Sequence, residues 1–281
     1  MTMKTILVTG CNGQLGRAVN EKYSASDYEL VNTDVSDLDI TDVDAVMEKV
    51  KSVNPVAIIN CAAYTAVDNS ESDWDNAYRI NAIGPRNLSI AASEVGVKLI
   101  HISTDYVFDG TASAPYREYD AVNPQGAYGK TKLEGEEFVR QFADRFFIIR
   151  TAWLYGDGKN FVKTMLRLSE DHDEVRVVSD QYGTPTSSVE LANAIAYLLP
   201  TDNYGTFHGT CEGSCSWADF TEEIFRIKGI DTVVKRITTK EYPTPAKRPA
   251  YSVLDNYMLR LTTDFSFSDW HDAIGAYLKQ I

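Results

Sequence analysis

The feature that most constrains the fold is a glycine-rich turn that directly follows an apolar run near the N-terminus. Residues 4–9, KTILVT, are rich in branched apolar side chains and predict a buried strand. The turn at residues 10–16, GCNGQLG, comes next, and residues 14–23 have the pattern of an amphipathic helix. Strand, glycine turn and helix in this order are the context of a dinucleotide-binding βαβ unit, although an ordinary strand-to-helix turn would share the pattern.

Each glycine of this turn would contribute to dinucleotide binding in a different way. Gly10 allows a sharp turn off the strand, Gly13 has no Cβ and lets a pyrophosphate approach the backbone, and Gly16 lets the helix pack close to the strand. The helix N-terminus then presents free N–H groups and a partial positive charge to the phosphates. The turn therefore predicts a dinucleotide cofactor.

A carboxylate, Asp34, follows a second predicted strand, residues 28–32, close to the ~20-residue spacing at which an acid bonds the ribose of NADH. It would repel the 2′-phosphate of NADPH, but a turn or helix cap explains it equally well. Asp39 and Ile40 lie in a loop where an adenine could rest. Small residues after a third strand, 55–62, either admit a cofactor or pack tightly. The predicted cofactor-binding residues are Gly10, Asn12, Gly13, Gln14, Leu15, Gly16, Asp34, Asp39, Ile40, Ala62, Ala63 and Tyr64.

The composition narrows the class of partner. With 27 Lys and Arg against 40 Asp and Glu, the chain of 281 residues has a net charge of −13, which disfavours nucleic acid and anionic membranes. No apolar run reaches the ~18 residues of a membrane span, and the N-terminus runs directly into a strand pattern, so a cytoplasmic location is expected. Cys211 and Cys215 are the only close pair of cysteines, and a reduced pair is expected instead of a zinc site.

Two further apolar runs, residues 97–103 and 146–151, complete a series of five predicted strands with helices between them. This alternation predicts an α/β fold with a doubly wound parallel sheet, the Rossmann architecture. Ligands gather beyond the carboxyl ends of strands in such a sheet. Thr104, at the end of the fourth strand, is therefore placed to donate a hydrogen bond to a substrate carbonyl. His101, flanked by isoleucines, is predicted to be a core side chain.

A tyrosine and a lysine, Tyr128 and Lys132, lie four residues apart in a helix predicted to begin near Pro124. Residues at this spacing share one face of a helix. A cation about 5 Å from the phenol, at an effective dielectric of ~20, contributes roughly 3 kcal/mol and lowers its pKa by about two units. An accidental surface pair would show the same spacing. Together with the glycine turn and Thr104, however, the pair predicts hydride transfer between a nicotinamide and a carbon-bound oxygen.

The order of these motifs resembles the extended short-chain dehydrogenase/reductase superfamily. Within it, the chain is similar over essentially its whole length to the dTDP-4-dehydrorhamnose reductases. The later motifs are more specific than the glycine turn. The segments that carry the resemblance are STDYVFDG at 103–110, YGKTK at 128–132, RTAWLYG at 150–156, KNFVKTM at 159–165, DQYGTPTS at 180–187 and PTPAKRPAYSVLD at 243–255.

This resemblance implies reduction of the 4-keto group of dTDP-6-deoxy-L-lyxo-4-hexulose, with NADPH or NADH as cofactor, to give dTDP-L-rhamnose. Tyr128 is then the proton donor, Lys132 lowers its pKa and holds the nicotinamide ribose, and Thr104 binds the substrate oxygen. Arg248 would clamp the diphosphate, for which its planar fork is suited, although a solvated basic pair with Lys247 is the alternative. The implied substrate-binding residues are Thr104, Asp105, Tyr106, Trp153, Asn160, Phe161 and Arg248.

Some members of the family are metal-bridged homodimers that use acidic residues near the glycine turn and in a later helix. Here Arg17 and Ala18 follow the turn and no carboxylate occurs before Glu21, while Glu190 is present in the later helix. No metal is therefore expected, and a homodimer is left open.

Two domains are predicted. Residues 1–150 would form the dinucleotide-binding domain, to which residues 175–198 return by a strand at 175–179 and a helix at 188–198. Residues 151–174 and 199–281 would form a smaller C-terminal lobe that binds the substrate, with the active site in the cleft between the two.

Two other functions fit the same motifs. One is a nucleotide-sugar dehydratase or epimerase of the superfamily. Dehydratases place Asp-Glu after the threonine, whereas this chain has Asp105 and Tyr106, and tyrosine is a poor base toward carbon. The other is a non-catalytic regulatory subunit that keeps the cofactor. The intact Thr104, Tyr128 and Lys132 disfavour this alternative.

Overall fold

The computed structural model describes residues 4–281 and contains a central sheet of six parallel strands. The strand order is β10-β5-β4-β3-β1-β2, so the connections run outward in both directions from β1 and β3. This arrangement confirms the predicted doubly wound sheet. The strands are β1 (Lys4–Thr9), β2 (Tyr28–Thr33), β3 (Ala57–Asn60), β4 (Lys98–Thr104), β5 (Phe146–Thr151) and β10 (Gly205–His208).

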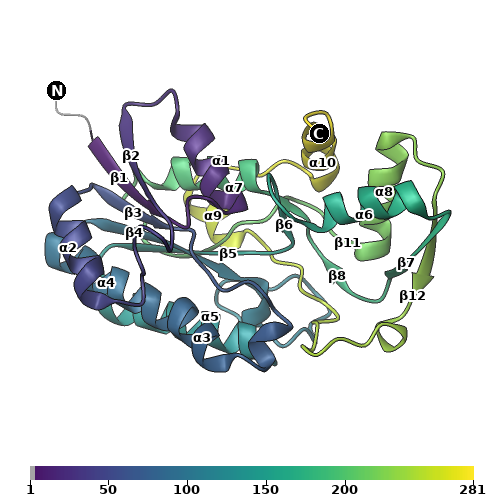
Figure 1. Cartoon of the computed structure of the whole chain (residues 1–281), viewed down its shortest axis with the longest axis horizontal. Coiled ribbons are helices and arrows are strands. Elements are labelled where there is room, and N and C mark those ends of the chain that lie inside the picture. The colour runs from purple at the N-terminus through teal and green to yellow at the C-terminus, as the bar shows by residue number, and fades with distance from the viewer. Residues whose placement is uncertain (1–3) are drawn as a thin grey trace.

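Helices cover both faces of the sheet (Figure 1). Side chains alternate along a buried strand, so Leu7 of β1 packs toward one face while Ile6 and Val8 pack toward the other. One face carries α2 (Val43–Val53), α4 (Gly84–Val95) and α5 (Ala127–Phe142), and the other carries α1 (Gln14–Tyr23) and α7 (Ser188–Leu198).

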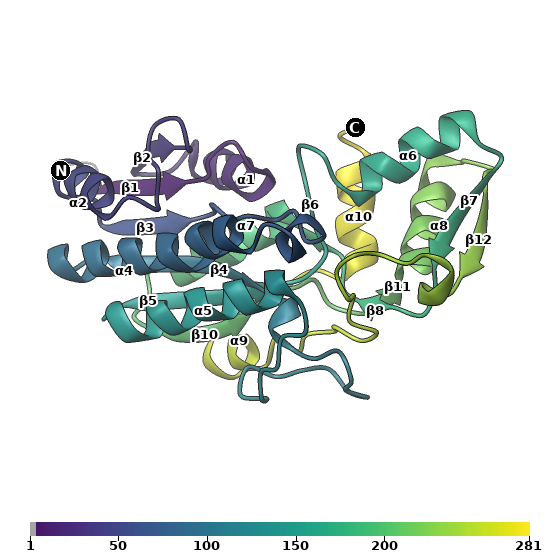
Figure 2. The same cartoon turned by 60° about the horizontal axis from the view of Figure 1, so that its bottom comes forward.

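A second, smaller core lies beside the carboxyl ends of the strands (Figures 1 and 2). Aromatic and aliphatic side chains such as Phe220, Ile224 and Trp270 fill it. Its elements are α6 (Phe161–Asp171), β7 (Glu174–Val178), β8 (Tyr182–Gly183), β11 (Cys215–Ser216), α8 (Trp217–Lys228), β12 (Val233–Ile237) and α10 (Trp270–Leu278). The short parallel pair of β6 (Leu154–Tyr155) and β9 (Thr186–Ser187) leads from the sheet into this region.

One predicted strand placement is wrong, and one strand of the main sheet was not predicted. The strand expected at residues 175–179 does not join the main sheet: β7 pairs in parallel with β12, because its alternate residues Val175 and Val177 are buried in the second core. The sixth position of the main sheet is instead taken by β10, in the range assigned to the lobe, where Phe207 packs on Phe147. With one large apolar residue, GTFH gives little local signal for a strand. Helix α9 (Tyr257–Thr262) packs beside β10.

The tyrosine helix begins later than predicted. Helix α5 starts at Ala127, not near Pro124. Its first N–H group, that of Ala127, donates to Glu71 Oε1 at 2.8 Å, and Glu71 is far away in the sequence. A cap supplied by a residue far away in sequence leaves no local pattern to read. On the same helix, Thr131 accepts a hydrogen bond from the buried amide of Asn81, which also bonds the backbone of Tyr64.

Asn81 lies in a π-helical turn, Arg79–Ile83, between α3 (Trp74–Tyr78) and α4. The three segments form one helical region from Trp74 to Val95, with a local widening where the amide turns inward. Among residues 4–281, none of the helices is both long and apolar enough to cross a bilayer.

Candidate active site

A cleft of about 420 Å³ opens at the carboxyl ends of β1, β3, β4 and β5, between the sheet and the second core. It brings together the glycine turn, the end of β4 and the tyrosine helix, which are far apart in sequence. The predicted site residues that line it are Gly13, Gln14, Leu15, Ala63, Thr104, Asp105, Tyr106, Tyr128, Lys132 and Trp153.

The glycine turn has the shape that a dinucleotide phosphate requires. Gly10 has a φ of 64°, and a Cβ there would lie 2.6 Å from the backbone N of Ala62. A Cβ on Gly16 would lie 2.4 Å from the carbonyl oxygen of Gly10. Gly13 is the N-cap of α1, and it supplies no side chain to the helix N-terminus. The N–H groups of that terminus therefore face the cleft free to bind phosphate, and the residues present fit the cofactor.

Asp34 acts as a turn cap in this structure. Its Oδ2 accepts a hydrogen bond from the N–H of Asn12 at 3.1 Å, and its Oδ1 accepts one from Val35 at 2.8 Å. The carboxylate thus ties the glycine turn to the end of β2 and lies beside the turn. Its predicted bond to the cofactor ribose remains a prediction. Asp39 caps the next turn through Thr41 N, and the side chain of Ile40 is buried against Gly84.

Tyr128 and Tyr106 meet in the cleft with their rings edge to face, 5.4 Å apart between centroids. Burial raises the pKa of Tyr128 above its ordinary value, while the hydrogen bond with Thr104 lowers it and the nearby Asp105 raises it further. The predicted downward shift is therefore wrong in direction for the protein alone, because removing the phenolate from water is the largest contribution to the pKa of Tyr128.

Lys132 is held in place by the backbone of β4. Its Nζ donates to the carbonyl oxygen of Ile102 at 2.6 Å, and only 2% of the residue is exposed. Burial lowers the pKa of this ammonium to about 8, which leaves it charged at neutral pH. One turn further along α5, the buried carboxylate of Glu136 forms an ion pair with Arg150 and raises the pKa of Lys132 slightly. The ammonium thus has a fixed position in the lining of the cleft, which Tyr128 shares.

Asp105 is almost fully buried, with 2% of its surface exposed. Its Oδ1 accepts a hydrogen bond from Thr104 Oγ1 at 2.9 Å, and its burial raises the pKa of the carboxyl to about 6, although bonds from Ser252, Thr104 and the backbone lower it. The carboxyl lines the cleft and is bonded to Thr104, so its contact with the sugar stays a prediction.

The folded state should therefore lose stability as pH rises through the titration of Asp105. Between about 4, the ordinary carboxyl value, and about 6, the folded protein binds more protons than the unfolded chain. Up to about 3 kcal/mol of unfolding free energy is expected to disappear over that window. Urea unfolding of the wild type and Asp105→Asn from pH 4 to 7 tests this. The variant should lack this component of the pH dependence, and identical curves would contradict the burial of an ionisable carboxyl.

A second cavity of about 480 Å³ adjoins the first and shares Tyr106 and Trp217 with it. Phe161 and Arg248 also line it. Arg248 donates from Nη1 to the Tyr106 hydroxyl at 3.1 Å and from Nη2 to Asp68 Oδ2 at 2.7 Å. The guanidinium therefore sits at the junction of the two cavities, held by a carboxylate from the loop after β3.

Asn160, in contrast, lies outside both cavities. It caps α6 by accepting from Lys163 N, and its amide donates to the carbonyl of Gly156 at 2.6 Å and to the Tyr277 hydroxyl at 3.1 Å. These bonds fix the loop between β6 and α6, so the structure shows Asn160 as a support for the loop that precedes Phe161.

Trp217 is a cleft residue that the sequence did not reveal. Its ring stacks on Trp153 at a centroid distance of 3.5 Å and an angle of 8°. Trp153 itself has a φ of 48°, a left-handed conformation that costs free energy for a tryptophan, and a Cβ on Gly183 would collide with its indole. A tryptophan at the start of a helix carries no motif, and only the fold places it here. Other cleft residues missed from the sequence are Cys61, Thr65, Val67, Ile102, Ser103, Thr151, Ala152 and Leu154.

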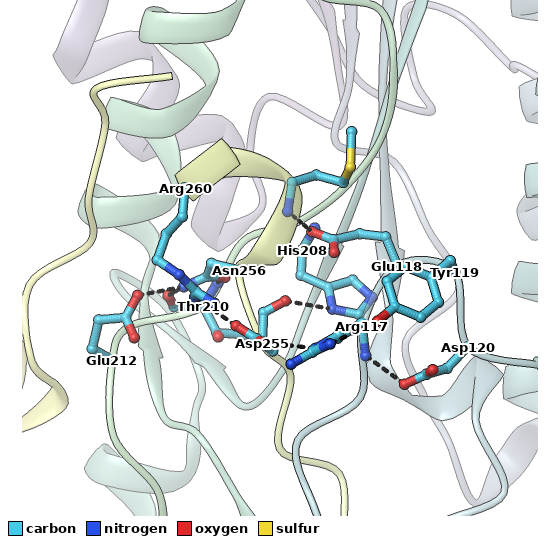
Figure 3. Close-up of polar contacts among 11 residues, drawn as sticks. Arg117, Glu118, Tyr119, Asp120, His208, Thr210, Glu212, Asp255, Asn256 and Arg260 are labelled. Carbon is cyan, nitrogen blue, oxygen red and sulfur yellow. Dashed lines mark hydrogen bonds and ion pairs between the residues drawn. The ribbon is translucent and has the colours of Figure 1, made fainter. Parts of the chain in front are cut away.

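The loop before the tyrosine helix and the segment after Arg248 are joined by a polar cluster (Figure 3). Glu118 accepts from the backbone N–H groups of His208 at 2.9 Å and Met258 at 3.1 Å, and Asp255 pairs with both Arg117 and Arg260. These contacts tie both segments to β10. Figure 3 shows the side chains converging from the three segments on one region next to the sheet.

Removing the carboxylate of Glu118 should therefore destabilise the fold. In Glu118→Ala the N–H groups of His208 and Met258 lose their acceptor, and a loss of about 2–4 kcal/mol in unfolding free energy is expected. The exposed Glu134 provides the control, and Glu134→Ala should change it by about 0.5 kcal/mol or less. Chemical unfolding of both variants decides, and equal stabilities would contradict the proposed anchoring.

Within residues 4–281, no group of three or more His, Cys, Asp or Glu side chains is placed to hold a metal ion. All four cysteines are free. His101 is fully buried against Asn60, and burial holds its pKa well below the ordinary value, which confirms it as a neutral core side chain.

Comparison with known proteins identifies the family. The family model described as the RmlD substrate binding domain matches residues 3–281. A dTDP-4-dehydrorhamnose reductase from Aggregatibacter actinomycetemcomitans is 41% identical over 286 residues and is covered to 97%, as is this chain. The crystal structure of a dTDP-4-dehydrorhamnose reductase from Clostridium acetobutylicum has a TM-score of 0.97 and 55% identity, covering 98% of this chain and 99% of that one.

A second crystal structure is informative for the cofactor. The dTDP-4-dehydrorhamnose reductase from Bacillus anthracis, in complex with NADP, has a TM-score of 0.98 and 40% identity, and 100% of each chain is covered. The match of the family model and the identity to these relatives both extend over nearly the whole chain. The chain therefore belongs to the family of the RmlD substrate binding domain, the dTDP-4-dehydrorhamnose reductases.

Proposed function

We propose that this protein reduces the 4-keto group of dTDP-6-deoxy-L-lyxo-4-hexulose to give dTDP-L-rhamnose, with NADPH or NADH as the reductant. One observation carries the proposal: Tyr128, Lys132 and Thr104 line a single cleft together with the glycine turn at the start of α1. The relatives named dTDP-4-dehydrorhamnose reductase and the NADP complex of one of them support the substrate and the cofactor.

The chemistry divides between the cofactor and the chain. The nicotinamide, when bound, supplies a hydride to the carbonyl carbon. Tyr128 gives its phenolic proton to the carbonyl oxygen, because it lines the cleft together with Lys132. The ammonium of Lys132 stabilises the phenolate that remains, an interaction that strengthens as ligands exclude water from the cleft. Thr104 orients the oxygen that receives the proton.

The two halves of the molecule bind different ligands, the dinucleotide and the nucleotide sugar. The half built on the six-stranded sheet, including α7, β10 and α9, binds the dinucleotide through Gly10, Gly13 and Gly16. The half built on the second core binds the nucleotide sugar, with Trp153 and Trp217 as an aromatic wall. This division replaces the predicted boundaries, since β7 belongs with the second core and β10 with the sheet.

The second cavity is the proposed site of the nucleotide. Arg248 lies at its junction with the cleft, and Asp68 holds the guanidinium there. An anionic diphosphate would gain a charge-assisted hydrogen bond from this group at the cost of weakening its contact with Asp68.

Arg248→Ala should raise the KM for the nucleotide sugar by roughly 10- to 100-fold and leave the cofactor KM nearly unchanged. The exposed neighbour Lys247 provides the matched control, and Lys247→Ala should change either KM by less than about threefold. Steady-state kinetics with each substrate varied in turn separates the two effects. Equal increases in both constants for Arg248→Ala would remove the diphosphate assignment.

Two alternatives make different predictions in the same assay. A dehydratase or epimerase returns its hydride and shows no net use of cofactor, and a regulatory subunit binds the cofactor without turnover. No carboxylate follows Asp105 here, and the Tyr106 hydroxyl is bonded to Arg248, so a second base toward carbon is lacking at this place. A panel of 4-keto nucleotide sugars with NADPH and NADH should show one cofactor oxidised per sugar reduced. Turnover without net oxidation would favour the first alternative.

A cytoplasmic location and a homodimer remain proposals. The four free cysteines support a reducing compartment. Fractionation of the source cells tests the location, and light scattering of the purified protein tests the oligomeric state.

A further inference from the structure

The hydroxyl of Thr104 has one hydrogen, and the structure commits it to Asp105. Thr104 Oγ1 donates to Asp105 Oδ1 at 2.9 Å and accepts from the N–H of Tyr106 at 3.2 Å. A threonine hydroxyl offers one donor and two acceptor positions. The remaining acceptor position can therefore take only a donor, and Tyr128 is the neighbouring hydroxyl that interacts with Thr104. In this arrangement Thr104 cannot donate to a ketone oxygen.

The surroundings of Asp105 favour the neutral acid. The residue is 2% exposed, and among residues 4–281 its Oδ2 has no hydrogen bond within normal distance, as is also true of the neighbouring Ser252 hydroxyl. Burial of a carboxylate with an unsatisfied oxygen costs free energy that protonation removes. The same burial raises the pKa of Asp105 to about 6, which brings its titration close to neutral pH.

The charged and titratable groups around Asp105 are engaged elsewhere. Tyr128 and Lys132 approach from α5, and Lys132 donates to a backbone carbonyl. Tyr106 follows in the same 3-10 turn and binds Arg248, which pairs with Asp68. The groups that favour ionised Asp105 are Thr104, backbone N–H groups and Ser252, whose hydroxyl forms no hydrogen bond of normal geometry, and among residues 4–281 no cation counters the burial.

On the basis of the proposed reductase function, we propose that Asp105 is a positioning residue that sets the direction of the hydrogen bonds of Thr104. When Asp105 is protonated, its O–H donates to Thr104 Oγ1, which still accepts from Tyr106 N. The hydrogen of Thr104 then turns to the ketone oxygen, and Tyr128 is free to pass its proton to that oxygen. The phenolate that results accepts from Thr104. Asp105 keeps its proton throughout, so the step consumes one proton, from Tyr128, and one hydride.

The pH profile of kcat tests this assignment between pH 5 and 7.5, below the pKa of Lys132 at about 8. In the wild type, kcat should fall as pH rises past the titration of Asp105, with a limiting slope of about tenfold per pH unit. Asp105→Asn carries an amide that donates to Thr104 at every pH. This variant should lose the decline, so that its kcat changes by less than about threefold between pH 5.5 and 7.5 while that of the wild type falls at least about tenfold.

Two further variants keep the test decisive. Asp105→Leu fills the space without a donor and should lower kcat at least about tenfold at every pH, with KM changed less than about threefold. Asp120→Asn, in the loop between Thr104 and Tyr128, should retain the wild-type profile. A decline in Asp105→Asn equal to that of the wild type, or a flat wild-type profile, overturns the proposal.

The proposal can also fail independently of the proposed function. If the wild type reduces none of the 4-keto nucleotide sugars, the proposed reductase function is contradicted and the pH profile of kcat cannot be measured. The unfolding curves of the wild type and Asp105→Asn then decide the structural part without any substrate. Loss of the pH dependence in the variant supports a buried carboxyl that titrates near pH 6, and unchanged dependence overturns it.

Discussion

Tyr128→Phe is expected to lower kcat by about 10²- to 10⁴-fold, because the variant keeps the ring and loses the proton that the ketone oxygen receives. The phenol lies in the cleft with Thr104 and Lys132, and its ring packs against Tyr106 at an angle of 78°, a contact that phenylalanine can retain. Cofactor binding should therefore change by less than about threefold. Stopped-flow and steady-state kinetics measure the first effect, and cofactor titration by fluorescence measures the second.

A matched control separates the proton from general damage to the cleft. Tyr182 is an exposed tyrosine outside it, and Tyr182→Phe should retain full kcat. Unchanged turnover in Tyr128→Phe would exclude the proposed acid, whereas equal losses in both variants would indicate that removing any hydroxyl weakens the fold.

Gly16→Ala is expected to abolish cofactor binding and to destabilise the protein. The new methyl group would lie 2.4 Å from the carbonyl oxygen of Gly10 and 2.6 Å from Cα of Cys11. Both are backbone atoms, so the glycine turn itself must move, and it is tied to β2 through Asp34 and Thr33. We expect a loss of cofactor affinity of at least about 100-fold and of roughly 1–3 kcal/mol in unfolding free energy.

Gly275→Ala is the control for this substitution. Gly275 lies in α10 and a Cβ there meets nothing within 4 Å, so alanine should stabilise the protein by about 0.5–1 kcal/mol and leave cofactor binding unchanged. Isothermal titration with NADPH and NADH and thermal unfolding measure both quantities. Normal affinity in Gly16→Ala would show that the dinucleotide does not bind at this turn.

The parts of the fold that were predictable are those with a strong local pattern. The apolar runs of β1 and β5 and the periodicity of α1 give these elements their observed bounds. The weak element was β10, where Phe207 is one large apolar residue among glycine, threonine and histidine. Its place beside β5 is decided by packing on Phe147, which is a long-range contact. The start of α5 was misplaced for the same reason, because Glu71 supplies the cap.

The residues of the candidate site also fall into those that a local pattern predicts and those that only the fold brings together. Tyr128 and Lys132 could be predicted because helix geometry puts residues four apart on one face, and Thr104 because it ends a strand. The direction of the pKa shift of Tyr128 could not, since it depends on how much water the folded cleft excludes. Trp217 could not be found either, because its partner Trp153 is remote in sequence and adopts a left-handed backbone that no local rule anticipates.

The central claim is that a hydride passes from the nicotinamide to the carbonyl carbon while Tyr128 protonates the oxygen. Reduction of the 4-keto nucleotide sugar with NADPH deuterated at the transferred position tests it directly. The account predicts one deuterium at C4 of the product sugar for each cofactor oxidised, and none in Tyr128→Phe within the wild-type reaction time. Deuterium that returns to the cofactor, or product that carries no label at C4, would contradict it.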